Sequence, residues 1–288
     1  MKKLIAMFLA VMLIVACFAG CGAQNPTADQ ADTTADQAGA TADQADTTGD
    51  NAEQTDSDLA YVQQQGKLIV GITEYEPMDY KDENGEWTGF DAELAKMFAE
   101  ELAVKCEYFV IGDWGKKFFE LETKNIDVVW NGMTITEEAT SNASVSDPYV
   151  INAQVVVMKA DKLADYPDAQ SMKDLTFAVE EGSAGQTVAE EAGLKTVSKQ
   201  DQAGALMEVA AGTADACVID ITMANAMTGE GTDYADLAAG ISLSSEEYGV
   251  AFRKGSDLTE KLNAYLKELK EDGTLEELAQ KYNLTLAE

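Results

Sequence analysis

The chain has 288 residues and a formal net charge of −32, with 52 acidic residues, 20 basic residues and no histidine. So acidic a composition excludes nucleic acid and an anionic membrane surface as natural partners. The lack of histidine removes the commonest metal ligand and the usual general base near neutral pH. We therefore expect neither a cofactor nor a metal site.

Residues 1–21 have the layout of a secretory signal, with Lys2 and Lys3 before an apolar run that ends in small residues. The ending FAGC resembles the lipobox of bacterial lipoproteins, in which the cysteine is lipidated and becomes the mature N-terminus. We expect a lipoprotein signal peptide over 1–21, with Cys21 carrying the lipid (palmitate), and Cys17 as the rival position. A retained transmembrane helix is the alternative, because the run approaches the ~17–25 residues that span a bilayer.

Residues 22–58 are predicted to be a disordered acidic tether. The heptad TADQADT at 27–33 recurs at 34–40 and 41–47, but no Leu, Ile or Val is available for a coiled-coil seam. Such a segment cannot bury enough apolar surface to offset its ordering entropy.

The remaining chain, from residue 59, contains 43 acidic and 18 basic residues, a net charge of −25. It predicts strands at 67–72, 105–111 and 126–130, separated by helices over 89–102 and 116–124. The same alternation restarts at 177 and ends with the strand ADACVID at 214–220, and helices close the chain from 255. This alternation of strands and helices predicts two doubly wound, mostly parallel α/β sheets. Cys106 and Cys217 lie in apolar strand-like runs and are expected to be buried thiols.

The chain must cross from one of these α/β units to the other and return. This arrangement implies a cleft between the two units. Ligands of open α/β sheets bind outside the carboxyl ends of the strands. Polar or aromatic segments leave the predicted strands at those ends: TEYEPMDY, GDWGKK, WNGMTIT, EEGSAGQ and the aspartate of IDITM.

Four motifs occur in the order found in one protein family: GFDAEL, TKNIDVVWNGMTIT, GTADACVID and YGVAFRKGSDLTEKLNAYLKELKEDGTLEEL. Residues 66–284 thereby resemble the family-3 extracellular solute-binding proteins, the polar amino acid-binding proteins of bacterial ABC importers. The resemblance implies an α/β, two-lobed fold of the type II periplasmic-binding-protein class, with two doubly wound sheets joined by a two-strand hinge. Lobe 1 would comprise 60–151 plus 248–288, and lobe 2 would comprise 152–247.

The resemblance also implies ligand contacts at named positions. Tyr75 and Trp114 match an aromatic pair that sandwiches the ligand, although both could be core aromatics. The loop Asn131, Gly132 and Thr134 matches one that binds the polar end of the amino acid. Ser183 and Ala184 lie on the facing loop of lobe 2, and Asp220 matches the aspartate that receives the α-ammonium. From their place along the chain, Glu74 and Glu180 are expected near the mouth of the cleft.

One expected ligand contact is missing. The family carries an arginine five residues after Thr134, and here that position is Ala139. The chain has one arginine, Arg253, in the returning strand. Either backbone N–H groups near Gly132 and Gly185 hold the carboxylate, or the ligand lacks a conventional one. Lys116 and Lys117 are expected to be exposed at a helix start, although either could supply the missing cation.

The sequence thus predicts a lipid-anchored, monomeric substrate-binding protein on the extracytoplasmic face of a bacterial cell membrane. It would capture a small amino acid or related amine, cationic or neutral rather than glutamate or aspartate, and pass it to an ABC permease. Its contact with the membrane would be the lipid anchor alone, and it would not be an enzyme. Two alternatives stay open: a lyase-like enzyme that uses Glu74 or Glu180, and the ligand-sensing subunit of a signalling system.

Overall fold

The computed structural model describes residues 57–288. The predicted signal peptide, most of the predicted tether and the lipidation site at Cys21 lie outside the described residues. Within 57–288, no helix is both long and apolar enough to cross a membrane.

The first sheet has five strands in the order β4-β1-β5-β14-β6. They are β1 (Lys67–Ile72), β4 (Lys105–Val110), β5 (Val128–Val129), β6 (Ser144–Val145) and β14 (Ala251–Phe252). Strand β1 runs parallel to both β4 and β5, while β14 is antiparallel to β5 and β6. A small two-stranded sheet, β2 (Tyr80–Lys81) with β3 (Trp87–Thr88), is attached to this half of the fold.

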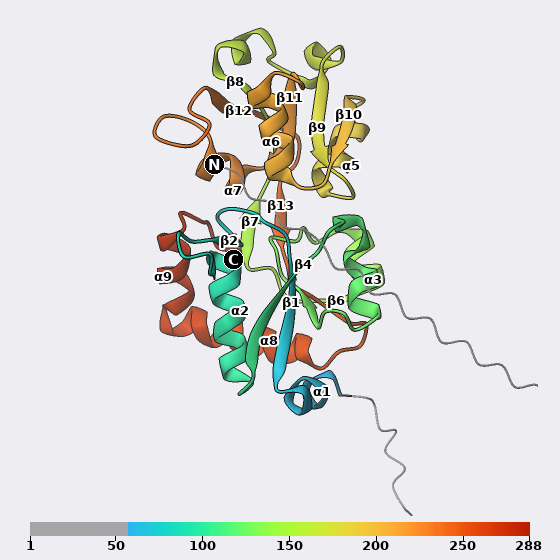
Figure 1. The fold of residues 1–288 in the computed structure, drawn as a ribbon, viewed down its shortest axis with the longest axis vertical. Helices are drawn as coiled ribbons and strands as arrows, with labels where there is room; N and C mark the ends of the chain where they lie inside the picture. The colour runs from blue at the N-terminus through green and yellow to red at the C-terminus, as the bar shows by residue number, and fades with distance from the viewer. Residues whose placement is uncertain (1–56) are drawn as a thin grey trace, which may run out of the picture. The chain divides into compact units, whose positions relative to one another are not determined.

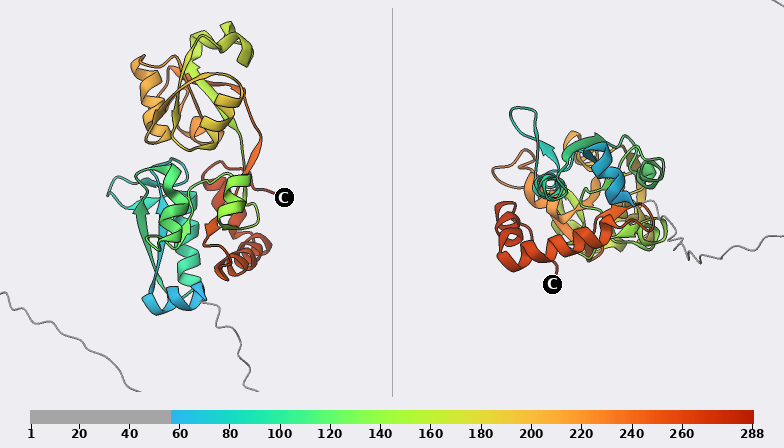
Figure 2. Two further views of the ribbon diagram at one scale, coloured as in Figure 1. Left: turned by 90° about the vertical axis from the view of Figure 1, so that its right-hand side faces the viewer. Right: turned by 90° about the horizontal axis from the view of Figure 1, so that it is seen from below.

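Helices cover the first sheet on both faces (Figures 1 and 2). These are α1 (Asp58–Gln65), α2 (Phe90–Glu101), α3 (Lys117–Glu122), α4 (Glu137–Asn142), α8 (Leu258–Asp272) and α9 (Thr274–Lys281), with a 3-10 turn, η1 (Trp114–Lys116). Helix α2 packs against β1 and β4 through Phe90, Leu94 and Phe98, which are fully buried. Their helical spacing is the one that predicted this helix.

The second sheet has the order β10-β9-β11-β8-β12. Its strands are β8 (Gln154–Lys159), β9 (Thr176–Glu180), β10 (Lys195–Lys199), β11 (Ala216–Asp220) and β12 (Leu237–Ser242). Helices α5 (Ala184–Glu191), α6 (Gln202–Ala211) and α7 (Ile221–Met227) pack around it, with 3-10 segments η2 (Ala160–Asp165) and η3 (Ala169–Met172). Strands β8 and β11 are buried over almost their whole length, as their apolar sequences require for central strands.

Two antiparallel strands connect the halves: β7 (Val150–Asn152) leads into the second sheet and β13 (Glu246–Tyr248) returns (Figure 1). Both sheets belong to one compact unit, Ala52–Glu288. The lobe limits expected at 151/152 and 247/248 fall inside these two strands. The predicted architecture, two α/β sheets joined by a two-strand hinge, is confirmed.

The structure corrects three details of the expectation. Each sheet is mixed rather than mostly parallel, because β14 in one sheet and β8 in the other run antiparallel to their neighbours. Helix α1 begins inside the range assigned to the tether, since Ser57 caps α1 and accepts a hydrogen bond from the Ala60 N–H. Cys217 is buried as expected, but Cys106 is only half-buried because β4 is an edge strand.

Arg253, directly after β14, joins this strand to the first residue of α1, Asp58. Its guanidinium contacts Asp58 at 2.8 Å and Asp127 at 3.1 Å, and Nη1 donates to the Ile126 carbonyl at 2.9 Å. All three side chains are at most 11% exposed. The single arginine therefore has a structural role in the first lobe, where it stabilises two buried carboxylates.

We expect Arg253→Met to lower the free energy of unfolding by about 3–5 kcal/mol, because two buried carboxylates lose their counter-charge. Urea unfolding followed by circular dichroism measures the change. Lys267→Met is the control, since its side chain is 76% exposed and lies 3.9 Å from Glu271. Equal losses in the two variants would contradict the prediction.

Candidate ligand-binding site

A cavity of about 420 Å³ lies between the two lobes. All ten residues expected to bind a ligand line it: Glu74, Tyr75, Trp114, Asn131, Gly132, Thr134, Glu180, Ser183, Ala184 and Asp220. They lie at the ends of β9 and β11 or in segments that follow β1, β4, β5 and β9. Carboxyl ends of neighbouring parallel strands share one edge of a sheet, so one edge of each sheet brings residues distant in sequence together.

Asp220, at the end of β11, is 3% exposed and is held by side-chain amides. Its carboxylate accepts hydrogen bonds from Gln154 Nε2 at 2.7 Å, from Asn152 Nδ2 and from Gln202 Nε2. Gln202 Oε1 also accepts the backbone N–H of Asp220 at 2.9 Å. These amides fix the carboxylate in one orientation, with burial and then the Glu246 charge raising the pKa of Asp220 to about 6.

Glu246, in the hinge strand β13, is a second carboxylate at the same end of the cavity. Its Oε1 accepts from Asn152 Nδ2 and Gln154 Nε2, each at 2.7 Å, so the same two amides bridge both acids. The Thr134 hydroxyl donates to Glu246 Oε1 at 2.8 Å. The sequence analysis did not identify Glu246 or the three amide residues. Nothing local distinguishes them, because they meet only when the hinge strands pair.

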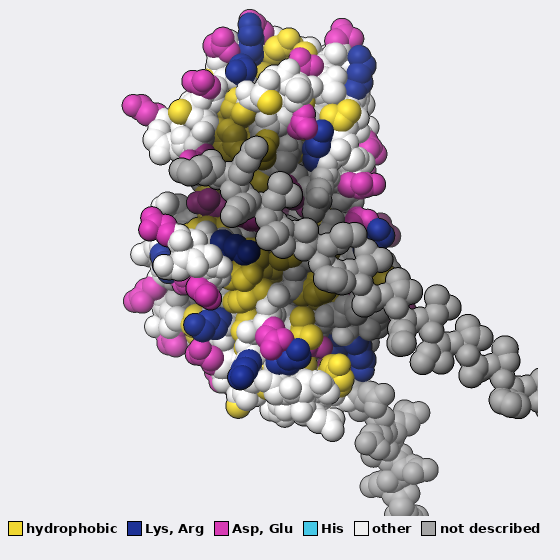
Figure 3. Space-filling view, viewed as in Figure 1, with side chains coloured by type: hydrophobic (Ala, Val, Ile, Leu, Met, Phe, Trp, Pro, Cys, Tyr) yellow, Lys and Arg dark blue, Asp and Glu magenta, His cyan; other side chains and the backbone are white. Residues whose placement is uncertain are grey.

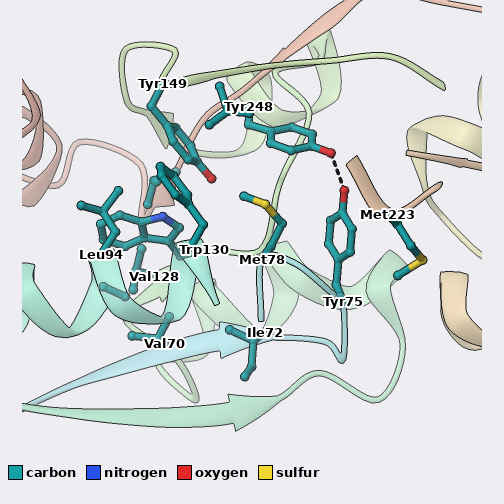
Figure 4. Close-up of a cluster of buried hydrophobic side chains, with 14 of the residues drawn as sticks. Val70, Ile72, Tyr75, Met78, Leu94, Val128, Trp130, Tyr149, Met223 and Tyr248 are labelled. Carbon is teal, nitrogen blue, oxygen red and sulfur yellow. Dashed lines mark hydrogen bonds between the residues drawn. The ribbon is translucent and has the colours of Figure 1, made fainter. Parts of the chain in front are cut away.

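Tyr75 joins the lobes rather than standing free at the cavity wall. Its hydroxyl is hydrogen-bonded at 2.5 Å to Thr222 Oγ1 in lobe 2 and at 2.5 Å to the hydroxyl of Tyr248 in the hinge (Figure 4). The ring lies against Gly132, where an added Cβ would stand 2.6 Å from Tyr75 Cε1. Gly132 also has a φ of +55°. A glycine is therefore required both by the backbone conformation and by the close approach of the ring.

Buried polar groups of lobe 1 hold the loop that contains Gly132 in place. The Gly132 N–H donates to Asp91 Oδ2 at 2.6 Å, and the Tyr149 hydroxyl donates to the same carboxylate at 2.8 Å. Asn131 Oδ1 accepts the backbone N–H of Thr73. Asp91 belongs to the GFDAEL motif, so that motif positions the loop after β5.

Lys117 does not lie where the sequence analysis placed it. It is 5% exposed and lines the cavity, with Nζ 4.9 Å from the Trp114 ring centroid. Nζ also donates to the carbonyl oxygens of Trp114 at 3.4 Å and Gly182 at 3.5 Å. The expected exposure was wrong because the cavity wall, not solvent, surrounds this first residue of α3. Burial lowers the pKa of Lys117 from its ordinary value. Lys116 is exposed, as expected.

Three residues in and near the loop after β5 have structural roles. Thr136 caps α4 by accepting the Ala139 N–H at 3.1 Å. Trp130 is fully buried and packs edge to face on Phe98. Ala139 is 1% exposed in an apolar cluster with Trp114 and Met133, so the position of the absent arginine offers no polar group to the cavity.

The charge of the cavity is strongly unbalanced. Seven lining side chains are acids: Glu74, Glu137, Glu138, Glu180, Glu191, Asp220 and Glu246. Lys117 is the one basic residue among the lining residues. On the outer face in Figure 3, acidic side chains are scattered over both lobes with basic ones between them. Within the described part of the chain, no group of three or more His, Cys, Asp or Glu has a geometry that holds a metal ion.

The sheets, the two-strand hinge and the cavity between the lobes define a binding protein of the type II periplasmic-binding class. Residues 68–285 match the family described as "Bacterial extracellular solute-binding proteins, family 3". The chain belongs to that family.

Named relatives include the arginine-binding extracellular protein ArtP of Bacillus subtilis, 33% identical over 226 residues, which cover 75% of this chain and 86% of ArtP. The L-cystine-binding protein TcyA of the same species is 31% identical over 286 residues, which cover 98% of this chain and 97% of TcyA. A similar solved structure is the ancestral amino acid-binding protein AncCDT-1, described as a precursor of cyclohexadienyl dehydratase. Its TM-score is 0.72 at 34% identity, covering 78% of this chain and 99% of that one. The named relatives are binding proteins rather than enzymes.

The backbones of the two lobes meet at two glycines, Gly115 and Gly182. A Cβ added to Gly182 would lie 2.7 Å from Gly115 Cα and 2.9 Å from Gly115 N, and Gly182 has a φ of +74°. A Cβ added to Gly115 instead would keep 4.0 Å from Gly182. The contact between the lobes therefore depends on the absence of a side chain at Gly182.

We expect Gly182→Ala to hold the lobes apart and to weaken solute binding about tenfold or more, because overpacking costs ~1–3 kcal/mol. Small-angle X-ray scattering should show a larger radius of gyration. Gly115→Ala is the matched control and should change neither quantity. An unchanged radius of gyration in Gly182→Ala would contradict this account of lobe contact.

Proposed function

We propose that this chain is the lipid-anchored substrate-binding protein of a bacterial ABC importer. It captures an amino acid that carries a free α-ammonium group, with cationic and neutral side chains favoured over acidic ones. The ligand is held between the lobes and delivered to a membrane permease. The family's extracellular placement supports a site of action outside the cytoplasm, with attachment through Cys21 and no other membrane contact. The folded part is proposed to act as a monomer.

The observation that carries the proposal is the Asp220 carboxylate. It is buried, oriented by three amides and placed in a cavity whose volume lies in the ~300–1,000 Å³ range of small-molecule sites. A buried carboxylate is costly without a cationic partner. An ammonium group of the ligand supplies that partner, and it is common to all free amino acids.

The α-carboxylate of the ligand needs a partner other than arginine. Lys117 Nζ is the cation available in the cavity, and Ala184, the first residue of α5, presents a backbone N–H group to the cavity. We propose that these groups share the carboxylate. A single buried lysine among seven acids cannot offset a second ligand carboxylate, which is why acidic amino acids are disfavoured.

Isothermal titration of the purified full chain with a panel of amino acids tests the function. We expect dissociation constants in the micromolar range or below for at least one cationic or neutral amino acid. Glutamate and aspartate should bind at least 100-fold more weakly, because the lining acids repel their side chains. The absence of binding across the panel would overturn the proposed function.

We expect Asp220→Asn to weaken amino acid binding about 100-fold, or ~2.7 kcal/mol, since the ligand ammonium loses a charged acceptor. The same change at Asp174, an exposed residue that does not line the cavity, should have no effect. Titration calorimetry measures both affinities, and thermal unfolding shows whether each variant is folded. Equal affinities in the two variants would rule out Asp220 as the ammonium partner.

A further inference from the structure

Glu180 differs from Asp220, the other buried acid that lines the cavity, because one of its carboxyl oxygens has no hydrogen-bond partner in the described part of the chain. It ends β9, is 4% exposed and lines the cavity. Its Oε1 has no hydrogen-bond partner among residues 57–288. No basic side chain of that part of the chain forms an ion pair with it. A buried carboxyl group in this condition requires either a proton or a partner from outside the protein.

The charged groups that face Glu180 are mostly of its own sign. Asp220 and Asp201 lie on the lobe 2 side, and the Gln202 amide lies near the carboxyl group. Lys117 faces it from lobe 1, but Nζ of Lys117 already donates to two carbonyl oxygens and sits over the Trp114 ring. Two of the three N–H donors of Lys117 are therefore used by backbone carbonyl groups, and Lys117 forms no ion pair with Glu180.

We propose that Glu180 is the specificity-determining residue of the cavity: it binds a cationic group on the ligand's side chain and releases a proton to solvent as that group arrives. The inference rests on the proposed function and narrows it to amino acids with a second cationic group, such as an amine or guanidinium. In this step the O–H bond of the Glu180 carboxyl group breaks, its proton passes to solvent, and the ligand's cation takes its place. No oxidant, reductant or covalent intermediate is involved.

The pKa of Glu180 agrees with the burial of its unpartnered carboxyl oxygen. Burial, followed by the charges of Asp220 and Asp201, raises the pKa of Glu180 to about 8. The group is consequently mostly protonated at pH 7. An incoming cation favours the ionised form, so binding of a cationic side chain should strengthen as pH rises and level off above about pH 8.

Asp220 supplies the contrast that makes the proposal testable. Its carboxylate accepts several amide hydrogen bonds, and its pKa of about 6 leaves it mostly ionised at pH 7. It should bind the α-ammonium of any amino acid with little proton release. Proton release that depends on the ligand's side chain is then a property of Glu180 alone.

The experiment compares L-lysine with L-norleucine, which has the same carbon skeleton without the side-chain amine. Titration calorimetry of the full chain at pH 7 in phosphate and in Tris, which differ in ionisation enthalpy, gives the number of protons released. We expect lysine to release close to one proton more than norleucine. The ratio of lysine to norleucine affinity should also rise nearly tenfold per pH unit below pH 7, as expected for a single linked proton.

Glu180→Gln should abolish the difference in proton release and lower the affinity for lysine at least tenfold, while norleucine binding persists and reports a folded site. Glu181→Gln is the matched control, because this neighbouring glutamate is exposed and does not line the cavity. Equal proton release for the two ligands in the unmodified chain, or an excess retained in Glu180→Gln, would overturn the inference while leaving the proposed function intact. Failure of both ligands and of the whole amino acid panel would overturn the proposed function, and this inference with it.

Discussion

A buried carboxylate, that of Asp220, constrains most of the architecture around the cavity. A charge removed from water must be compensated locally, and the fold does this with amides from three separate elements. Asn152 comes from the hinge strand β7, Gln154 from β8 and Gln202 from the start of α6. Because two of these amides also hold Glu246 of the second hinge strand, the anion is tied to the place where the chain crosses between lobes. The proposed ammonium-binding carboxylate and the hinge strands thus share one hydrogen-bonded network.

The missing arginine and the surplus of acids have one physical interpretation. Ala139 is packed in an apolar cluster, and the single arginine of the chain stabilises two buried aspartates that do not line the cavity. The cavity retains one cation, Lys117, against seven acids. The negative electrostatic potential of such a lining attracts cations and disfavours additional negative charge. The proposed discrimination against acidic amino acids therefore follows from the balance of the lining charges, and Glu180 is proposed to distinguish among the remaining ligands.

Contacts between the lobes flank the cavity. At one contact, Tyr75, Thr222 and Tyr248 join lobe 1, lobe 2 and the hinge through hydrogen bonds between their hydroxyl groups. At another contact, Gly182 meets Gly115 at a distance that leaves no room for a side chain on Gly182. Tyr75 was expected to stack on a ligand, yet its hydroxyl is engaged by protein groups and its ring supports Gly132. Its place in the cavity wall and its role in joining the lobes are compatible, because the ring face and the hydroxyl point to different partners.

The sequence by itself determined the elements and the segments that form the site. Apolar periodicity predicted the strands and helices, and polar residues directly after strands predicted which loops meet, since strand order in α/β sheets follows general rules. Local pattern did not reveal the residues whose role depends on pairing between distant strands: Glu246, Gln154 and Gln202 have no distinguishing neighbours in the chain. Burial of a charged side chain also depends on what packs around it, which explains why Lys117 was expected in solvent and was found in the cavity wall. Tertiary structure alone decided these positions, because a hydrogen bond or a desolvated charge is a property of groups brought together by the fold.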